Sequence, residues 1–129
     1  MLSNIVCFET LIAWQKARDR RRAMDQVTQH RAFAKDFGLT RQIQRAAVSI
    51  MSNIAEGVER SVRREFHQLC SAAQGACGEV RSPLYVAFDV GYLVEDDFQR
   101  LLAQAAEVGR VVGGLRASVE KLGDKRRSV

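Results

Sequence analysis

The sequence is poor in the features that mark membrane, secreted and fibrous proteins. It has one proline among 129 residues, and no segment approaches the roughly 18 consecutive apolar residues that a membrane-spanning helix needs. The apolar run at residues 5–8 is also too short for the core of a signal peptide. Cys7, Cys70 and Cys77 are an odd number of cysteines and lack the spacing of a disulfide framework. We therefore expect reduced thiols, a cytoplasmic protein and no association with a membrane.

Motifs for catalysis and metal binding are equally scarce. The sequence has no Gly-Lys-Ser loop that holds a phosphate and no nucleophile elbow. His67 and Cys70 are close in sequence, but nothing indicates a third group that would orient them. Cys70 and Cys77 are two helical turns apart, roughly 10 Å along the axis, which is too far for ligands of one zinc ion. The sequence predicts a protein that is not an enzyme and holds neither a metal nor a cofactor.

What the sequence does contain is a strong helical pattern. Hydrophobic residues make up 47% of the chain, and they recur at alternating steps of three and four, the period of a helix that buries one face. The clearest such series is Phe98, Leu101, Ala105, Val108, Val112, Leu115, Val119 and Leu122. We predict helices over residues 11–28, 40–59, 62–90 and 95–122, followed by a basic tail at 123–129. Because most connections are short, residues 1–129 are expected to form one all-α domain, an antiparallel up-down-up-down four-helix bundle.

Three residues bear on the helix predicted at 62–90. Ser61 precedes it and is typical of an N-cap, whose hydroxyl accepts a hydrogen bond from the backbone. Gly91 follows it and suits the left-handed position at a helix end. Pro83 lies inside it and removes one backbone donor, which predicts a kink about one turn upstream.

The helix predicted at 40–59 carries two apolar stripes instead of one. The first consists of Ile43, Ala47, Ile50 and Ile54. The second consists of Val48, Met51, Ala55 and Val58. A small bundle covers only one side of such a helix, so the second stripe needs another cover. We predict that this second stripe is the subunit interface of a homo-oligomer.

Positive charge is concentrated in the first third of the chain. The whole chain has 20 basic and 15 acidic side chains, a formal net charge of +5. Residues 14–46 alone contain nine basic and three acidic side chains, a net charge of +6. The candidates for contacts with the phosphates of a nucleic acid are Arg18, Arg20, Arg21, Arg22, Arg41 and Arg45. The alternative is a solvated face that only keeps the protein soluble.

A polar motif lies where the helix at 40–59 ends. Asn53 and Glu56 are three residues apart, and Arg60 follows Glu56 by four, so the three side chains can form one network. This network is either a site for a ligand or partner, or a polar clasp that holds the turn, with Gly57 permitting a close approach. Pairs at this spacing are common stabilisers of helices, which favours the clasp.

Several segments resemble a known family. They are FGLTRQIQRAAVSI at 37–50, SNIAEG at 52–57, WQKA at 14–17, REF at 64–66 and GYL at 91–93. In this order they resemble the four-helix-bundle proteins that are encoded in intervening sequences of bacterial 23S rRNA genes. The resemblance spans residues 8–122, and SNIAEG is its most specific part. The sequence departs from the family pattern at Ala34 and Met51, where proline is usual, at Pro83, which is extra, and at Arg20 and Arg21, where apolar residues are usual.

The resemblance implies an assembly and a set of partners. The family is an up-down-up-down bundle whose members are thought to form homopentameric rings around a central channel. It is similar to the accessory protein of diversity-generating retroelements, a basic oligomer that associates with a reverse transcriptase and nucleic acid. No enzymatic activity is established for the family. The implied partners are therefore other copies of the chain, RNA or DNA, and a reverse transcriptase or another protein.

Two functions follow as hypotheses. The first is a non-catalytic, oligomeric nucleic-acid-binding or accessory protein that contacts phosphates through its arginines and does not read bases. The second is a protein interaction scaffold without a nucleic-acid ligand. The surroundings of the arginines distinguish the two. A continuous exposed stripe favours nucleic acid, whereas arginines paired with Asp19, Asp25 or Asp36 favour a scaffold or a structural role.

Overall fold

The computed structural model describes residues 7–127, and the side chains of residues 7–121. In this range the chain forms only helices: the 3-10 helix η2 (Phe8–Thr10) and the α-helices α1 (Ile12–Thr28), α2 (Arg31–Lys35), α3 (Phe37–Arg60), α4 (Arg63–Asp89) and α5 (Glu95–Arg127). The prediction of an all-α fold is thus confirmed for the described residues. α5 continues to Arg127, so the prediction that the last helix ends near residue 122 in a separate tail is wrong. Residues 128–129 of that tail lie outside the described residues.

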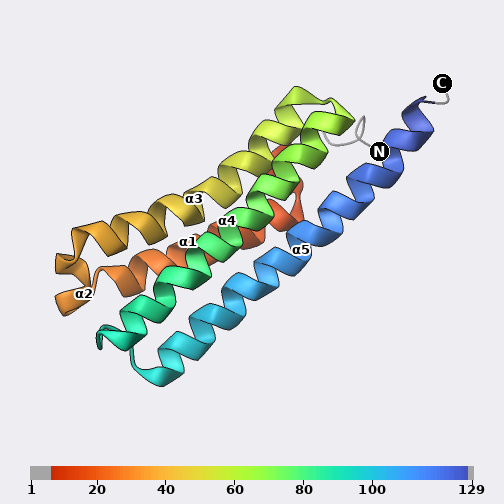
Figure 1. Cartoon of the computed structure of the whole chain (residues 1–129). Coiled ribbons are helices and arrows are strands. Elements are labelled where there is room, and N and C mark those ends of the chain that lie inside the picture. Colours follow the sequence, from red (N-terminus) through yellow and green to blue (C-terminus); the bar gives the residue numbers. More distant parts are fainter. Residues whose placement is uncertain (1–6, 128–129) are drawn as a thin grey trace.

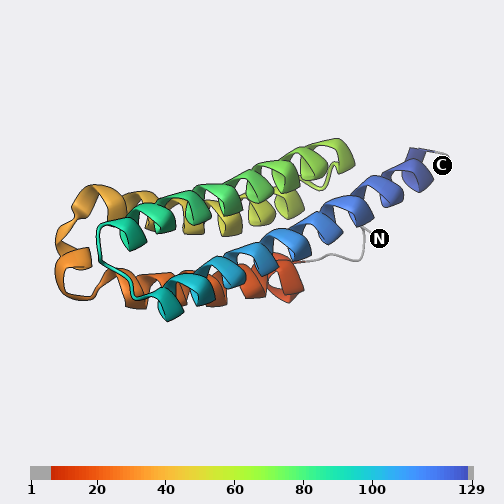
Figure 2. The ribbon, with the colours of Figure 1, turned by 60° about the horizontal axis from the view of Figure 1, so that its bottom comes forward.

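The four long helices lie side by side in two layers, with α3 and α4 in one and α1 and α5 in the other (Figure 2). Figure 1 shows that α1 and α4 run toward the end of the molecule where α2 lies, whereas α3 and α5 run away from it. At the opposite end α5 extends past the α3–α4 turn (Figures 1 and 2). α3 packs against α1 and α4, and α5 packs against α4 and α1. Each of the four long helices therefore packs against two of the others.

α3 begins three residues earlier than the sequence pattern predicted. Asp36 is its N-cap, and the carboxylate accepts the backbone N–H of Leu39 at 3.1 Å. The hydroxyl of Tyr92 donates to the other carboxylate oxygen at 3.0 Å, and this hydrogen bond raises the pKa of Tyr92. Thr40 lies inside the helix, where its hydroxyl donates to the Asp36 carbonyl. The short helix α2, which was not predicted, leads the chain into this cap.

Of the two predictions for the ends of α4, the one for its start is wrong and the one for its end is confirmed. Ser61 has a left-handed backbone, with φ of 57°, and its hydroxyl donates to the Val58 carbonyl at 3.1 Å. It is the C-cap of α3, and the N-cap position of α4 is occupied by Val62, so the prediction of Ser61 at that position is wrong. Gly91 has φ of 85°, and the next backbone N–H, of Tyr92, reaches back to the Ala87 carbonyl at 2.8 Å. This is the left-handed helix end that the sequence predicted. α4 runs through Pro83 without a break.

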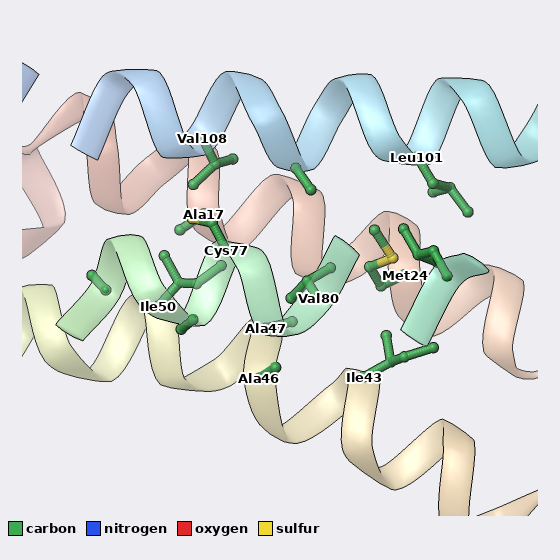
Figure 3. Packing of buried hydrophobic residues seen from close by; sticks show 14 of the residues in the cluster. Ala17, Met24, Ile43, Ala46, Ala47, Ile50, Cys77, Val80, Leu101 and Val108 are labelled. Carbon is green, nitrogen blue, oxygen red and sulfur yellow. The ribbon is translucent and has the colours of Figure 1, made fainter. Parts of the chain in front are cut away.

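The core forms where the inner faces of the four long helices meet. Figure 3 shows Ala17 and Met24 of α1 near Ile50 and Ile43 of α3, with side chains of α4 and α5 completing the packing. The α5 series is buried at Phe98, Leu101, Ala105, Val108, Val112 and Val119. Leu115 is partly buried, and the side chain of Leu122 lies outside the described range. The heptad spacing therefore identified the inner face of this helix correctly.

Candidate functional site

The arginines of α1 point in different directions. Arg18 and Arg22 are one turn apart and both are exposed. The guanidinium carbon of Arg18 lies 5.8 Å from the centre of the Trp14 ring, which holds its side chain along the helix. Within the described range Arg22 has no hydrogen bond or ion pair. These two residues present positive charge to solvent.

Arg20 faces α5 instead. Its guanidinium donates to the carboxylate of Glu107 at 2.7 Å, and Lys16 lies 3.6 Å from the same carboxylate. The hydrogen bond from Arg20 lowers the pKa of Glu107. Both side chains are half-buried at the α1–α5 boundary. Arg20 is therefore neutralised inside the protomer.

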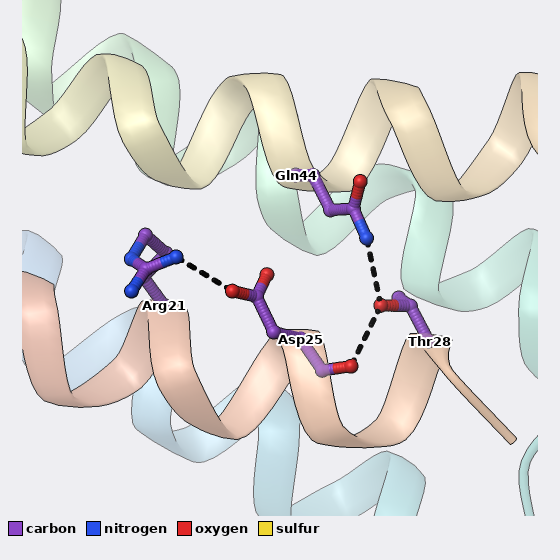
Figure 4. A network of polar contacts seen from close by, with 4 residues as sticks. All are labelled: Arg21, Asp25, Thr28 and Gln44. Carbon is purple, nitrogen blue, oxygen red and sulfur yellow. Dashed lines mark hydrogen bonds and ion pairs between the residues drawn. The ribbon is translucent and has the colours of Figure 1, made fainter.

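Arg21 faces α3. It forms an ion pair with Asp25, one turn along the same helix, at 2.6 Å. Figure 4 places this pair beside Thr28, whose hydroxyl donates to the Asp25 carbonyl at 3.1 Å and accepts from the amide of Gln44 at 3.2 Å. The arginine that interrupts the apolar face of α1 is thus accommodated by a local pair at the α1–α3 boundary.

Arg41 and Arg45 lie on α3 and are exposed. Among the described side chains neither takes part in an ion pair or a hydrogen bond. They line a hollow of about 540 Å³ between α3 and α4. The remaining residues around the hollow are Gly38, Gln42, Ala46 and Ser49 from α3 and Glu79 from α4. The structure thereby adds Gln42, Ser49 and Glu79 to the candidate site.

The stripe predicted as a subunit interface is only partly exposed. Val48 is 45% exposed, and Met51 and Ala55 are partly buried. Val58, in contrast, is 5% exposed and packs against Phe66, Cys70 and Val119. Its assignment to an exposed interface is wrong, because the start of α4 and the end of α5 cover it within the protomer. Val48, Met51 and Ala55 stay as the predicted interface.

The polar motif at the end of α3 divides into two parts. Arg60 donates to Glu56 at 2.7 Å and to Glu65 of α4 at 3.4 Å, so these side chains span the α3–α4 turn. Asn53 is not part of this network, and its amide donates to the carbonyl and the hydroxyl of Ser49 at 2.8 and 3.0 Å. At Gly57, a Cβ atom would lie 2.7 Å from the Phe66 ring. The turn therefore needs glycine at this position, and Asn53 instead binds Ser49, which lines the hollow.

A second groove follows the boundary between α4 and α5, and no pattern in the sequence predicted it. Two hollows of about 600 and 340 Å³ adjoin along it, because both are lined by Arg81 and Ala106. Arg110 lines the smaller hollow, and Tyr85, which is 53% exposed, lines the larger. Neither arginine has an ion pair within the described range. Arg81 and Arg110 are therefore two cations without a described ion pair, and both lie outside the positively charged segment 14–46.

His67, Cys70 and Cys77 lie on α4 and do not form a metal site. His67 accepts from Arg116 at 3.3 Å, and Arg116 also donates to Gln74 at 3.1 Å. Cys70 and Cys77 are buried and free. Among the described residues, no three histidine, cysteine or acidic side chains gather as a metal site would require. In the same range, no helix is both long enough and apolar enough to span a membrane.

The buried thiols predict a loss of stability in alkali. Burial raises the pKa of Cys70 and of Cys77 to about 11, against only partial opposition from Arg116 and Arg81 respectively. The folded protein then binds these protons more tightly than the unfolded chain, so stability falls as pH rises from 9 toward 11. At pH 10 we expect a loss of about 1 kcal/mol for each thiol. Urea unfolding at pH 8 and pH 10 measures it, and a Cys70→Ala, Cys77→Ala variant should show a flatter profile.

Comparison with known proteins gives a family and a fold. A family profile described as 23S rRNA-intervening sequence protein matches residues 9–114. A solved structure of a protein with unknown function, from the S23 ribosomal protein family of Bacteroides thetaiotaomicron, has a similar fold with a TM-score of 0.73. The two chains are 17% identical, and the similarity covers 81% of this chain and 98% of the other. No curated protein matches the chain. At this identity the structural likeness concerns the fold alone.

Proposed function

The chain belongs to the 23S rRNA-intervening sequence protein family, whose profile matches residues 9–114, and from this premise we propose that it is a non-catalytic, homo-oligomeric nucleic-acid-binding protein. The observation that carries the proposal is a set of four exposed arginines on two neighbouring helices. Arg18 and Arg22 lie on α1, and Arg41 and Arg45 lie on α3. No ion pair neutralises any of them within the described range. Arg20 and Arg21 are left out of the set, because Glu107 and Asp25 already neutralise them.

Contacts of this kind fix a protein on the phosphate backbone. A guanidinium donates several parallel hydrogen bonds to phosphate oxygens and releases the counterions that the nucleic acid had condensed. Such binding depends on salt and tolerates any sequence, since phosphates carry no base information. The proposed role is therefore attachment to a nucleic-acid backbone, as an accessory protein would provide, without base readout.

Assembly is the second part of the proposal. We infer that the antiparallel four-helix protomers form a closed ring, most simply a homopentamer, through Val48, Met51 and Ala55 of α3. Val48 supports this, because a large apolar side chain is 45% exposed beside two partly buried apolar neighbours. A ring would repeat the four arginines around one axis and strengthen the local positive field.

The experiment is a binding titration of the assembled protein. Mixed-sequence RNA and duplex DNA should both bind at 50 mM salt. On duplex DNA log K should fall with log salt by about 0.9 for each phosphate neutralised, hence by about 4 for the four arginines of one protomer. No detectable binding of either nucleic acid at 50 mM salt would refute the proposed function.

A scaffold for a protein partner is the second candidate. The ion pair between Arg21 and Asp25, at 2.6 Å, favours it, because this arginine already has a structural role within the protomer. In this case the exposed arginines would meet acidic side chains of a polymerase or another protein. Pull-down from nuclease-treated lysate separates the two functions. A protein partner is retained after nuclease treatment, whereas a partner held through nucleic acid is lost.

We place this function in the cytoplasm. Cys7, Cys70 and Cys77 are all free in the structure. Free thiols persist where the cell keeps its proteins reduced.

A further inference from the structure

The hollow between α3 and α4 combines charges of both signs that do not neutralise each other. Arg41 and Arg45 line it from α3, and Glu79 lines it from α4. None of the three forms an ion pair with another described residue. Its volume of about 540 Å³ falls within the roughly 300–1,000 Å³ that is usual for small-ligand sites. The hollow therefore offers both cationic donors and an anionic acceptor to one bound group.

The donors of the hollow suit a phosphodiester. The two arginines are four residues apart on one helix face, about 6 Å along the axis. Ser49 lies in the same hollow, and its hydroxyl oxygen already accepts from the Asn53 amide at 3.0 Å. The hydroxyl hydrogen of Ser49 has no acceptor among the described residues, so it is free to be donated to a ligand oxygen. Asn53 thus orients a third donor beside the two guanidinium groups.

Glu79, unlike the arginines and Ser49, needs a hydrogen-bond donor on the ligand. An ionised carboxylate only accepts hydrogen bonds, so it repels phosphate oxygens and binds a hydroxyl. The hydroxyl closest to a backbone phosphate in RNA is the ribose 2′-OH, which DNA lacks and by which proteins distinguish the two. Carboxylates bind this ribose hydroxyl in dinucleotide sites as well. An unpaired carboxylate opposite two arginines therefore matches a ribose beside its phosphate.

We propose that the α3–α4 hollow holds one nucleotide of an RNA strand, with Arg41, Arg45 and Ser49 on the phosphate and Glu79 on the 2′-hydroxyl. The protein then prefers RNA to DNA of the same sequence. This inference rests on the proposed function and adds to it the type of nucleic acid. It also gives Glu79 a role, although a carboxylate alone would weaken binding to any polyanion.

The test compares strands that differ only at the 2′ position. Fluorescence anisotropy of the assembled full chain is measured with single-stranded oligo(U), oligo(dU) and 2′-O-methyl oligo(U) of equal length and at equal salt. Oligo(U) should bind about tenfold more tightly than the other two, because neither of them donates a 2′ hydrogen bond to a charged acceptor. Glu79→Ala should bring the three affinities together by weakening oligo(U) relative to oligo(dU).

Glu59→Ala is the matched control. Glu59 is an exposed carboxylate on α3 that lies outside the hollow and has no described partner, so the variant makes the same change in net charge. It should tighten all three strands alike and preserve the preference. Equal affinity of the wild type for oligo(U) and oligo(dU), or a preference that survives Glu79→Ala, overturns the inference while the proposed function stands. Failure of all three strands to bind at 50 mM salt overturns both.

Discussion

Replacing Phe66 by alanine is expected to destabilise the protein by about 3–5 kcal/mol. The Phe66 side chain is fully buried, with 0% exposure, in a cluster with Val58, Cys70 and Val119. This cluster joins the start of α4 to the ends of α3 and α5. Gly57 offers the ring a surface without a side chain, since a Cβ there would approach it to 2.7 Å. Removal of the ring leaves a cavity in this cluster, whose cost adds to that of the lost burial.

Urea unfolding measures this loss, and Phe37→Ala provides the same substitution at an exposed position. Phe37 is 68% exposed at the first turn of α3, so its replacement should change stability by no more than about 0.5 kcal/mol. A loss at Phe66 no larger than the loss at Phe37 would show that the α3–α4 turn does not contribute to the core as described.

Removal of the four proposed phosphate contacts is expected to reduce nucleic-acid binding by at least about a hundredfold at 50 mM salt. The variant carries glutamine at Arg18, Arg22, Arg41 and Arg45, all of which are exposed, so the fold should persist. Four lost counterion-release contacts also reduce the salt slope on duplex DNA by about 4. The titration described above measures both quantities.

The matched control removes four other arginines without a described ion pair, namely Arg63, Arg64, Arg81 and Arg110. The two variants have the same net charge and differ only in where the charge is lost. If the proposed surface is the binding site, the control retains most of its affinity and slope. Equal losses in the two variants would mean that overall charge, and not the four exposed arginines of α1 and α3, holds the nucleic acid.

Local patterns in the sequence predicted the helices and the inner face of α5 well. The steps of three and four from Phe98 to Val119 place side chains on one face whatever the helix packs against. Gly91 was identified for the same reason, because a left-handed helix end depends on one residue and its immediate neighbours. The start of α3 differs from the prediction because Asp36, which caps it, precedes the apolar periodicity on which the predicted start at residue 40 rests.

The sequence pattern could not predict contacts between residues that are far apart in the chain. Glu107 neutralises Arg20 from a position 87 residues away, and no spacing rule links the two. Val58 was assigned to an interface because the stripe on α3 gave no sign that Phe66 and Val119 cover it. The Arg21–Asp25 pair, in contrast, has the four-residue spacing of a helical ion pair and was within reach.

The residues of the candidate site were likewise predicted only in part. Arg41 and Arg45 were found as neighbours on one helix face, but Glu79 joins them only because α3 and α4 pack side by side. Ser49 lines the hollow and accepts a hydrogen bond from Asn53, a residue that the sequence pattern grouped with Glu56 and Arg60. The sequence therefore indicated the cations of the hollow, and the fold supplied its acceptor and its third donor.

We propose that copies of this chain assemble and jointly present their free arginines to nucleic acid. Light scattering of the purified protein, with and without RNA at 50 mM salt, tests it most directly. We expect a mass several times that of one chain, and a further increase when RNA is added. A mass equal to that of one chain, unchanged by RNA, would contradict it.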